Sequence, residues 1–170
     1  MDVMTAIETR RSIRQFTSKD IEDEKLLKVL EAARLAPSSS NKQQWKFIVV
    51  KERSLIEKFV EAADGQMFVA VAPAIIVGCA LEPESKMFCG QFRYPVDLSI
   101  AFSFMLLEAH ELGLGMCWIG HFFEDRVKSI LHIPEKVRVV AISPIGYPSE
   151  DPLQRPRKKL DEIICFDKYK

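Results

Sequence analysis

The chain has 170 residues, of which 48% are hydrophobic and 28% charged, a composition typical of a globular protein with a substantial core. Its 24 basic and 24 acidic side chains cancel to a formal net charge of zero, which argues against broad binding to nucleic acids or other polyanions. This length predicts one domain over residues 1–170, in which residues 152–170 form a C-terminal arm.

The spacing of cysteines and histidines excludes the common metal and disulfide frameworks. No C-x-x-C pair occurs, and the histidines lie eleven residues apart, so we expect no metal site and no disulfide scaffold. The first residues carry an acid and no long apolar run, so they do not resemble a secretory signal. We therefore expect a cytoplasmic protein. The residues concerned are Cys79, Cys89, Cys117, Cys165, His110, His121 and His132.

Hydrophobic periodicity predicts helices and strands that alternate along the chain, which favours mixed α and β layers around one sheet. Ser54 is the expected cap of the third helix, and Pro95 the expected first residue of the longest one. The run 74–80 is apolar throughout and rich in β-branched residues, so we expect a central strand there. In chain order, the expected elements are a short helix from Asp2, a helix over 20–35, a strand over 46–51, helices over 54–63 and 66–72, a strand over 74–80, an exposed connection over 82–94, a helix over 95–112, a short strand within 113–120, a helix over 124–131, a strand over 137–142 and a turn over 144–148.

The helix over 95–112 is apolar on nearly every side, which is unusual for a helix at a protein surface. Asp97, Ser99, Ser103 and Glu108 interrupt the apolar run, so we do not expect it to cross a membrane. A chain this short has little material with which to cover such a helix completely. A second copy of the chain would cover it, so the sequence predicts a homodimer.

Three arginines lie within the five residues from Arg10 to Arg14. Such a cluster is commonly a solvated charged face. Here Ser12 adds a hydroxyl between the arginines, and Ile13 and Phe16 supply apolar anchors that would hold the run against the body. In an extended segment Arg10, Ser12 and Arg14 lie on one side, which makes a cradle for a phosphate. Both interpretations stay open from these residues alone.

A polar segment from Ala36 to Trp45 separates the second helix from the strand that follows. Pro37 ends the helix, because it disfavours helical geometry for the residue before it. Ordinary loops are also rich in Ser and Asn. This loop, however, ends on Trp45 and leads directly into a core strand, so its hydroxyls and amides would be held in place. We therefore expect it to contact a ligand.

The C-terminal tail joins a basic run, 155–160, to a segment, 161–166, with an apolar ending. The basic run by itself is equally compatible with a solvated turn. The apolar segment that follows it predicts a strand that docks elsewhere, such as on the sheet edge of a partner.

Together these segments resemble the FMN-dependent nitroreductase family, over nearly the whole chain. The motifs that carry the resemblance are R-R-S-I-R-x-F from Arg10, A-P-S-S-S-N-x-Q-x-W from Ala36, G-L-G-x-x-W-I-G from Gly113, P-I-G-Y-P from Pro144 and R-P-R-K-K-L from Arg155. The resemblance implies an α+β fold of three layers, with a mixed central sheet flanked by helices. It also implies a homodimer with two FMN sites at its interface, and it allows the C-terminal segment to be exchanged between the subunits.

Carried over position by position, the resemblance implies which residues contact FMN. The arginines and Ser12 would hold the phosphate and one flavin edge, and the loop after Pro37 would come from the other subunit to line the ring. The turn ending at His121 would place a backbone N–H near the flavin N5 atom. No side chain is expected to act as a catalyst, because the cofactor supplies the chemistry, and His121 is more simply a nearby histidine. The implied cofactor-binding residues are Arg10, Arg11, Ser12, Arg14, Pro37, Ser38, Ser39, Asn41, Gln66, Ile119, Gly120, His121, Arg155 and Arg157.

The expected function is that of an FMN-dependent oxidoreductase, in which NAD(P)H reduces the flavin and a nitroaromatic, a quinone or a similar small acceptor reoxidises it. The alternative is a non-redox flavin protein that binds, stores or consumes the flavin. Nucleic-acid binding through the arginine clusters is disfavoured by the neutral net charge.

Two departures from the family pattern bear on the substrate. Gln44 stands where a proline is common in the family. The chain is also too short for the inserted helices that cover the substrate in larger members. We therefore expect a substrate pocket that is open, or shaped by residues 86–94 and 122–123.

Overall fold

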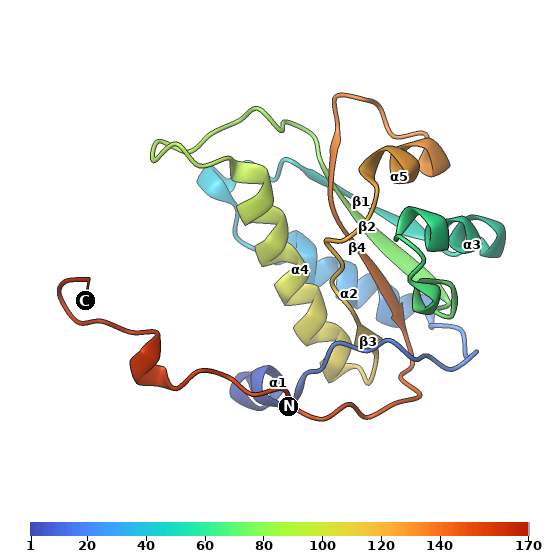
Figure 1. The fold of residues 1–170 in the computed structure, drawn as a ribbon, viewed down its shortest axis with the longest axis horizontal. Helices are drawn as coiled ribbons and strands as arrows, with labels where there is room; N and C mark the ends of the chain where they lie inside the picture. The colour runs from blue at the N-terminus through green and yellow to red at the C-terminus, as the bar shows by residue number, and fades with distance from the viewer. Residues whose placement is uncertain (170) are drawn as a thin grey trace.

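A four-stranded sheet forms the middle of the molecule (Figure 1). The computed structural model describes residues 1–169. Its strands are apolar runs rich in β-branched residues, which suit a pleated, buried surface, and they lie in the order β1-β2-β4-β3. Neighbouring strands pair antiparallel, and an isolated parallel bridge between Ser12 and Met116 gives one edge of the sheet a mixed character. The strands are β1 (Trp45–Val50), β2 (Ala74–Ala80), β3 (Gly115–Met116) and β4 (Arg138–Gly146).

The strand β2 is central and buried at every position, which confirms the prediction for the run 74–80. Its side chains alternate between the two faces, so that Ile75 enters the core on one face and Ile76 the core on the other. Gly78 allows the long helix to approach closely, because a Cβ at this position would lie 2.4 Å from atom Cε2 of Phe102.

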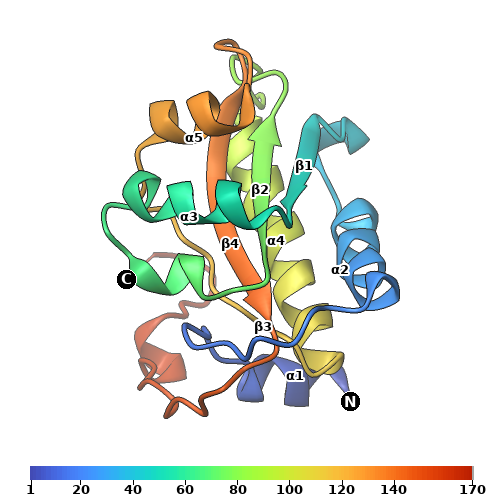
Figure 2. The same ribbon diagram turned by 90° about the vertical axis from the view of Figure 1, so that its right-hand side faces the viewer.

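Helices pack against both faces of the sheet, which makes three layers (Figure 2). On one face, α3 and α5 bury Phe59 and Val127. On the other, α2 and α4 bury Val29 and Phe102. The predicted α+β fold of three layers around one sheet is therefore confirmed. The helices are α1 (Val3–Thr9), α2 (Asp23–Leu35), α3 (Arg53–Ala62), α4 (Arg93–Glu111) and α5 (Glu124–Leu131), with short 3₁₀ turns at Ser39–Asn41, Met67–Ala70 and Leu160–Glu162.

The long helix α4 begins at Arg93, before the expected Pro95. One side of it packs on the sheet and on α2, and the opposite side leaves Val96 40% and Phe104 39% exposed. Part of the apolar surface of this helix therefore stays uncovered in a single copy of the chain. None of the described helices combines the length and the apolar content that a bilayer crossing requires.

The strand β4 continues through Pro144 to Gly146, where the sequence predicted a turn. The reason lies in its neighbour: residues 144 and 145 pair with the start of the buried strand β2, so the extended conformation is held by non-local contacts. The predicted cap of α3 also differs. Glu52 precedes the first turn, and the Ser54 hydroxyl donates a hydrogen bond to the Glu52 side chain.

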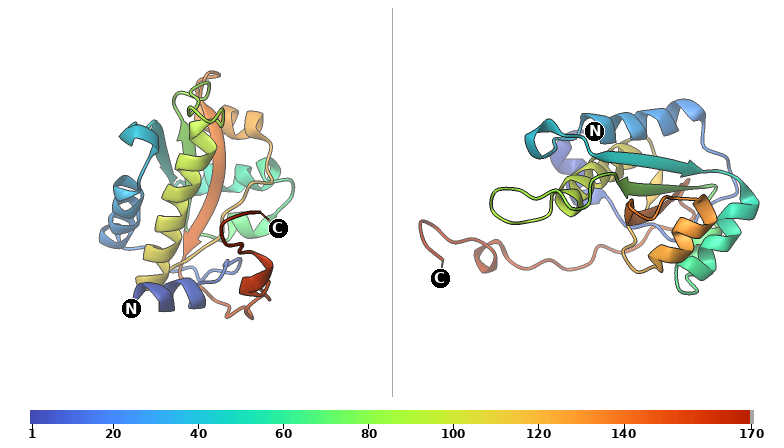
Figure 3. Two further views of the ribbon diagram at one scale, coloured as in Figure 1. Left: turned by 90° about the vertical axis from the view of Figure 1, so that its left-hand side faces the viewer. Right: turned by 90° about the horizontal axis from the view of Figure 1, so that it is seen from above.

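Residues 152–169 leave the body of the molecule as an extended arm (Figures 1 and 3). The arm bears one 3₁₀ turn, and its apolar side chains are exposed, Phe166 by 79%. The strand predicted over 161–166 is absent from the described single chain, because a lone strand has no sheet edge with which to pair. The last residue of the predicted arm, Lys170, lies outside the described residues.

Candidate functional site

Two basic segments from opposite ends of the chain line one cavity of about 510 Å³. The first follows α1, and the second begins the C-terminal arm. The cavity brings together six of the residues implied as phosphate contacts, while their role as cofactor ligands stays a prediction. Its lining consists of Ile7, Glu8, Arg10, Arg11, Ser12, Arg14, Pro152, Leu153, Gln154, Arg155 and Arg157.

The N-terminal segment is held in place by backbone hydrogen bonds and two apolar anchors. Arg10 ends α1 and donates its N–H to Ala6. Ile13 donates its N–H to the Met116 carbonyl at 3.1 Å, which aligns the segment with β3. Ile13 and Phe16 are both buried, as their apolar character predicted. Arg10 and Arg11, between the end of α1 and Ile13, and Arg14, between Ile13 and Phe16, therefore project from a fixed backbone.

The C-terminal segment is aligned with the first one by a short backbone ladder. Thr17 donates its N–H to the Tyr147 carbonyl at 2.8 Å, and Ser149 donates to the Gln15 carbonyl at 3.0 Å. Glu150 adds a side-chain contact, because its carboxylate accepts the N–H of Gln15 at 3.0 Å. This ladder directs the start of the arm past the N-terminal arginines.

The cavity carries a large positive charge that the described protein does not neutralise. Arg11 donates to the carbonyls of Glu8 and Arg10, each at 2.9 Å, and Arg157 donates to the carbonyl of Arg155 at 3.1 Å. None of the five cavity arginines forms an ion pair within residues 1–169; the arginines that do are Arg34, Arg53, Arg126 and Arg138. Guanidinium groups without carboxylate partners, beside a serine hydroxyl, suit a multiply charged oxyanion such as a phosphate.

The positive charge also acts on His110, which accompanies Arg10 and Arg11 in an adjoining cavity of about 210 Å³. Its Nε2 atom lies 2.8 Å from the Thr9 hydroxyl oxygen. Burial lowers the pKa of this imidazole, and the nearby charges of Arg10 and Arg11 lower it further.

A second group of implied residues meets at the turn after β3. Ile119 is buried and exchanges backbone hydrogen bonds with Ile142 of β4. Gly120 lies under Trp118, because a Cβ there would be 2.9 Å from the indole ring. Gln66 donates its side-chain N–H to the His121 carbonyl at 2.9 Å.

The His121 side chain points to Asp64, since 2.9 Å separates its Nε2 from the Asp64 carboxylate. Sequence reasoning did not single out Asp64. This pair and the Gln66 contact tie the turn to the end of α3. His121 thus contacts Asp64, and its interpretation as a nearby histidine rather than a catalyst stays a prediction.

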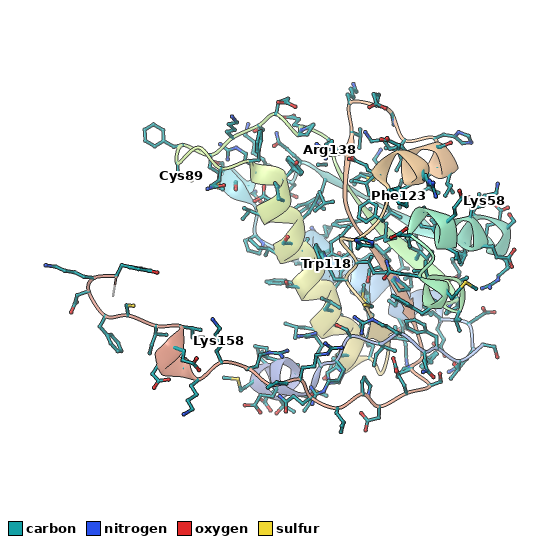
Figure 4. The ribbon with its side chains drawn as sticks, in the orientation of Figure 1. Lys58, Cys89, Trp118, Phe123, Arg138 and Lys158 are labelled. Carbon is teal, nitrogen blue, oxygen red and sulfur yellow. The ribbon has the colours of Figure 1, made fainter. Side chains whose placement is uncertain are left out.

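The arginine cavity and this turn lie close together on the molecule. The Arg14 guanidinium carbon lies 5.7 Å from the centre of the Phe68 ring, which follows Gln66 by two residues. Ser12 bridges to Met116, and the chain then passes through buried Cys117, whose pKa is raised by burial, to Trp118. In Figure 4, Trp118 lies near the middle of the face in view.

The polar loop 37–41 lies elsewhere in the chain. Ser39 donates its N–H and its hydroxyl to the carboxylate of Asp97 in α4, at 2.9 and 2.8 Å. His110, beside the arginine cavity, follows Asp97 by thirteen residues, which is about 20 Å along an α-helix. One copy of the chain therefore does not bring Pro37, Ser38, Ser39 and Asn41 to the arginines.

Asp97 is the main residue that sequence reasoning missed here. Its signal in the sequence is an acid inside an apolar helix, a pattern that indicates a helix outside the membrane and names no partner for the acid. Its partner Ser39 lies 58 residues away in the chain, so local patterns do not reveal the contact.

Comparison with known proteins identifies the family. The chain matches the family model described as "Nitroreductase family" over residues 7–91 and 90–147. It is 40% identical over 167 residues to a protein of Methanothermobacter thermautotrophicus with the provisional name NADH dehydrogenase/NAD(P)H nitroreductase. That alignment covers 96% of this chain and 86% of the relative.

Solved structures agree with this assignment. A nitroreductase family protein from Clostridium novyi NT is similar with a TM-score of 0.84 and 36% identity, over 95% of this chain and 91% of that one. An FMN-dependent nitroreductase from Clostridium difficile R20291 is similar with a TM-score of 0.84 and 32% identity, over 98% and 100% of the two chains. The family predicted from five sequence motifs is confirmed: the chain belongs to the nitroreductase family.

Proposed function

We propose that this chain is an NAD(P)H-dependent FMN oxidoreductase that works as a homodimer in the cytoplasm and reduces a nitroaromatic, a quinone or a similar small acceptor. The broad class, an NAD(P)H-dependent flavin oxidoreductase, is supported by the family and by the names of the relatives. The observation that carries the proposal is the arginine cavity, where Arg14 lies 5.7 Å from the centre of the Phe68 ring.

The residues present fit FMN. Arginines from both ends of the chain, together with Ser12, offer bidentate and charge-assisted hydrogen bonds to a phosphate dianion. Trp118 and Phe68 supply flat apolar surface beside them, as an aromatic ring system requires. When bound, FMN supplies the redox chemistry by accepting a hydride from NAD(P)H and passing electrons to the acceptor.

The side chains of this protein then act by binding and orienting. Arg10, Arg14 and Arg155 would hold the phosphate, and the backbone contacts of Arg10 and Arg14 would help to set where the ring lies. The backbone of Ile119, Gly120 and His121 would border the ring, and the missing side chain at Gly120 lets the Trp118 indole pack closely against this turn. Gln66 keeps this turn in place through the His121 carbonyl.

The second copy supplies the parts of the site that one chain leaves apart. The loop 37–41 lies about 20 Å along α4 from the arginines of its own chain, so in our proposal it lines the flavin bound to the partner. The exposed side of α4 and the apolar arm offer the surface that such a partner would cover. Exchange of the arm between subunits would bury the exposed side of α4 and the apolar side chains of the arm.

A spectrum of the purified protein tests the proposal. We expect FMN absorbance in the protein as isolated or after addition of FMN, and rapid bleaching when NADH or NADPH is added without oxygen. Reoxidation by a quinone or a nitroaromatic then identifies the acceptor class. A flavin that stays oxidised with both nicotinamides would favour the non-redox alternative, and a protein that takes up no FMN would overturn the proposal.

A further inference from the structure

Asp97 is a buried carboxylate in the second turn of α4, with 4% of its surface exposed. Within residues 1–169 no Lys or Arg forms an ion pair with it, and its hydrogen bonds come from one residue, Ser39. Burying a carboxylate without a cation costs free energy unless its oxygens are hydrogen-bonded. The contact with Ser39 is therefore what makes this placement tolerable.

Ser39 opens a loop with an unusual backbone. Ser40, Asn41 and Gln43 have positive φ angles of 54°, 53° and 52°. This region is costly for residues with a side chain, least so for Asn, and it persists only where surrounding contacts impose it. A loop with three such residues within four positions would relax if it were not tied down.

Few other contacts hold this loop. The Ser38 hydroxyl accepts the N–H of Gln43 at 3.0 Å, which closes the loop on itself. Arg93 reaches the Ser40 hydroxyl at 3.4 Å, a long hydrogen bond. The two bonds from Ser39 to Asp97 are shorter, and they end on a buried side chain of a long helix. Asp97 is thus the firmest tie between the loop and the rest of the fold.

The same helix faces outward at Val96 and Phe104, the side that our proposed dimer covers. The hydrogen bonds between Ser39 and Asp97 therefore fix the loop relative to α4, the helix that contacts the second copy in our proposal. These bonds thereby set where the loop lies against the partner's site.

We propose that Asp97 is a positioning residue for the cofactor, which holds Ser39 and the strained loop 38–43 in the geometry that lines the flavin ring of the partner subunit. This inference rests on the proposed function. It assigns Asp97 to the ring side of the site, far from the arginines that hold the phosphate.

A comparison of FMN binding with riboflavin binding distinguishes a defect beside the flavin ring from a defect at the phosphate. Riboflavin lacks the phosphate, so a defect on the ring side weakens FMN and riboflavin by the same factor. A defect at the arginines weakens FMN alone. A residue with a purely structural role lowers the melting temperature without changing the affinity of the folded dimer for either flavin.

The experiment titrates flavin-free protein with FMN and with riboflavin, followed by flavin fluorescence, for the wild type and the variants Asp97→Ala, Asp97→Asn and Ser39→Ala. Asp23→Asn is the matched control, because Asp23 is an exposed aspartate on α2. Mass in solution, circular dichroism and melting temperature are recorded for each protein.

We expect Asp97→Ala to weaken both flavins by about tenfold or more, which is the loss of hydrogen bonds to a charged group. Asp97→Asn should weaken both by a smaller factor, since its amide oxygen still accepts from Ser39 without the charge. Ser39→Ala removes only the hydroxyl and should also weaken both. If Asp97→Ala does not fold, the affinities of Asp97→Asn and Ser39→Ala for the two flavins decide the question.

The outcomes are distinguishable. Unchanged affinities in folded dimeric variants overturn this inference and leave the proposed function standing. A loss confined to FMN also overturns it, because that result places the effect at the phosphate. A wild type that binds neither flavin overturns the proposed function, and this inference with it.

Discussion

The carboxylate of Glu150 accepts a hydrogen bond from the backbone N–H of Arg14, 136 residues earlier in the chain. The contact uses the backbone of Arg14, so its guanidinium stays available to the cavity. It also fixes the register between the N-terminal arginines and the start of the arm that bears Arg155 and Arg157. An acid thus assembles the basic site without neutralising its guanidinium groups.

Replacing Arg14 by alanine should weaken FMN binding and spare riboflavin. The substitution removes a charged donor and keeps the backbone contact with Glu150. Loss of a charge-assisted hydrogen bond of about 1.5–3 kcal/mol predicts roughly tenfold to hundredfold weaker FMN. Fluorescence titration measures both ligands, and Arg34→Ala on the surface of α2 is the control. An equal loss for riboflavin would place Arg14 on the ring instead.

Removing the arm should abolish the dimer as well as tight FMN binding. A chain that stops after Asp151 loses Arg155 and Arg157 together with the exposed apolar side chains of the arm. We expect a monomer in sedimentation experiments. The double variant Arg155→Ala/Arg157→Ala separates the two effects, since it should stay dimeric and lose affinity for FMN alone. A truncated chain that remains dimeric would show that the arm does not hold the subunits together.

Binding of FMN should raise the pKa of His110. In the flavin-free protein that pKa is lowered from 6.5 by burial and by the charges of Arg10 and Arg11, and a phosphate dianion at these arginines offsets their repulsion. The bound state then takes up a proton more readily, so binding tightens as pH falls through the window between the two pKa values.

Titration of the His110 ring protons by NMR, with and without FMN, measures this shift. Because the phosphate itself also titrates near this range, His110→Gln is the reference for the pH dependence of the affinity. Riboflavin should leave the pKa of His110 where it is. Identical pH profiles for the wild type and His110→Gln would contradict the linkage.

Adding a methyl group at Gly78 should destabilise the fold. The new Cβ would lie 2.4 Å from Phe102, and such overpacking costs about 1–3 kcal/mol of the free energy of unfolding. Urea denaturation of Gly78→Ala measures the cost. The double variant Gly78→Ala/Phe102→Leu should recover part of it, because the smaller side chain clears the ring position. No recovery would indicate a backbone effect at Gly78.

Much of this molecule follows from short-range patterns. The run 74–80 is apolar on both faces and becomes the central strand, and the periodic segment 124–131 becomes α5 with the predicted bounds. Arg10 to Phe16 contains both its arginines and the anchors that fix them. In each case the element can be predicted from residues close together in the chain, because hydrophobic periodicity and the preference of a side chain for burial are local properties of the sequence.

Contacts between distant segments depended on the assembled fold. Arg155 meets Arg10 because a ladder between residues 15–17 and 147–149 aligns the two segments. The strand β4 runs through Pro144 because β2 pairs with it, against the local turn preference. Asp97 acquires its partner only when α4 packs beside the loop of Ser39. Local patterns specify which residues are apolar, charged or flexible, whereas packing over tens of residues specifies which of them meet.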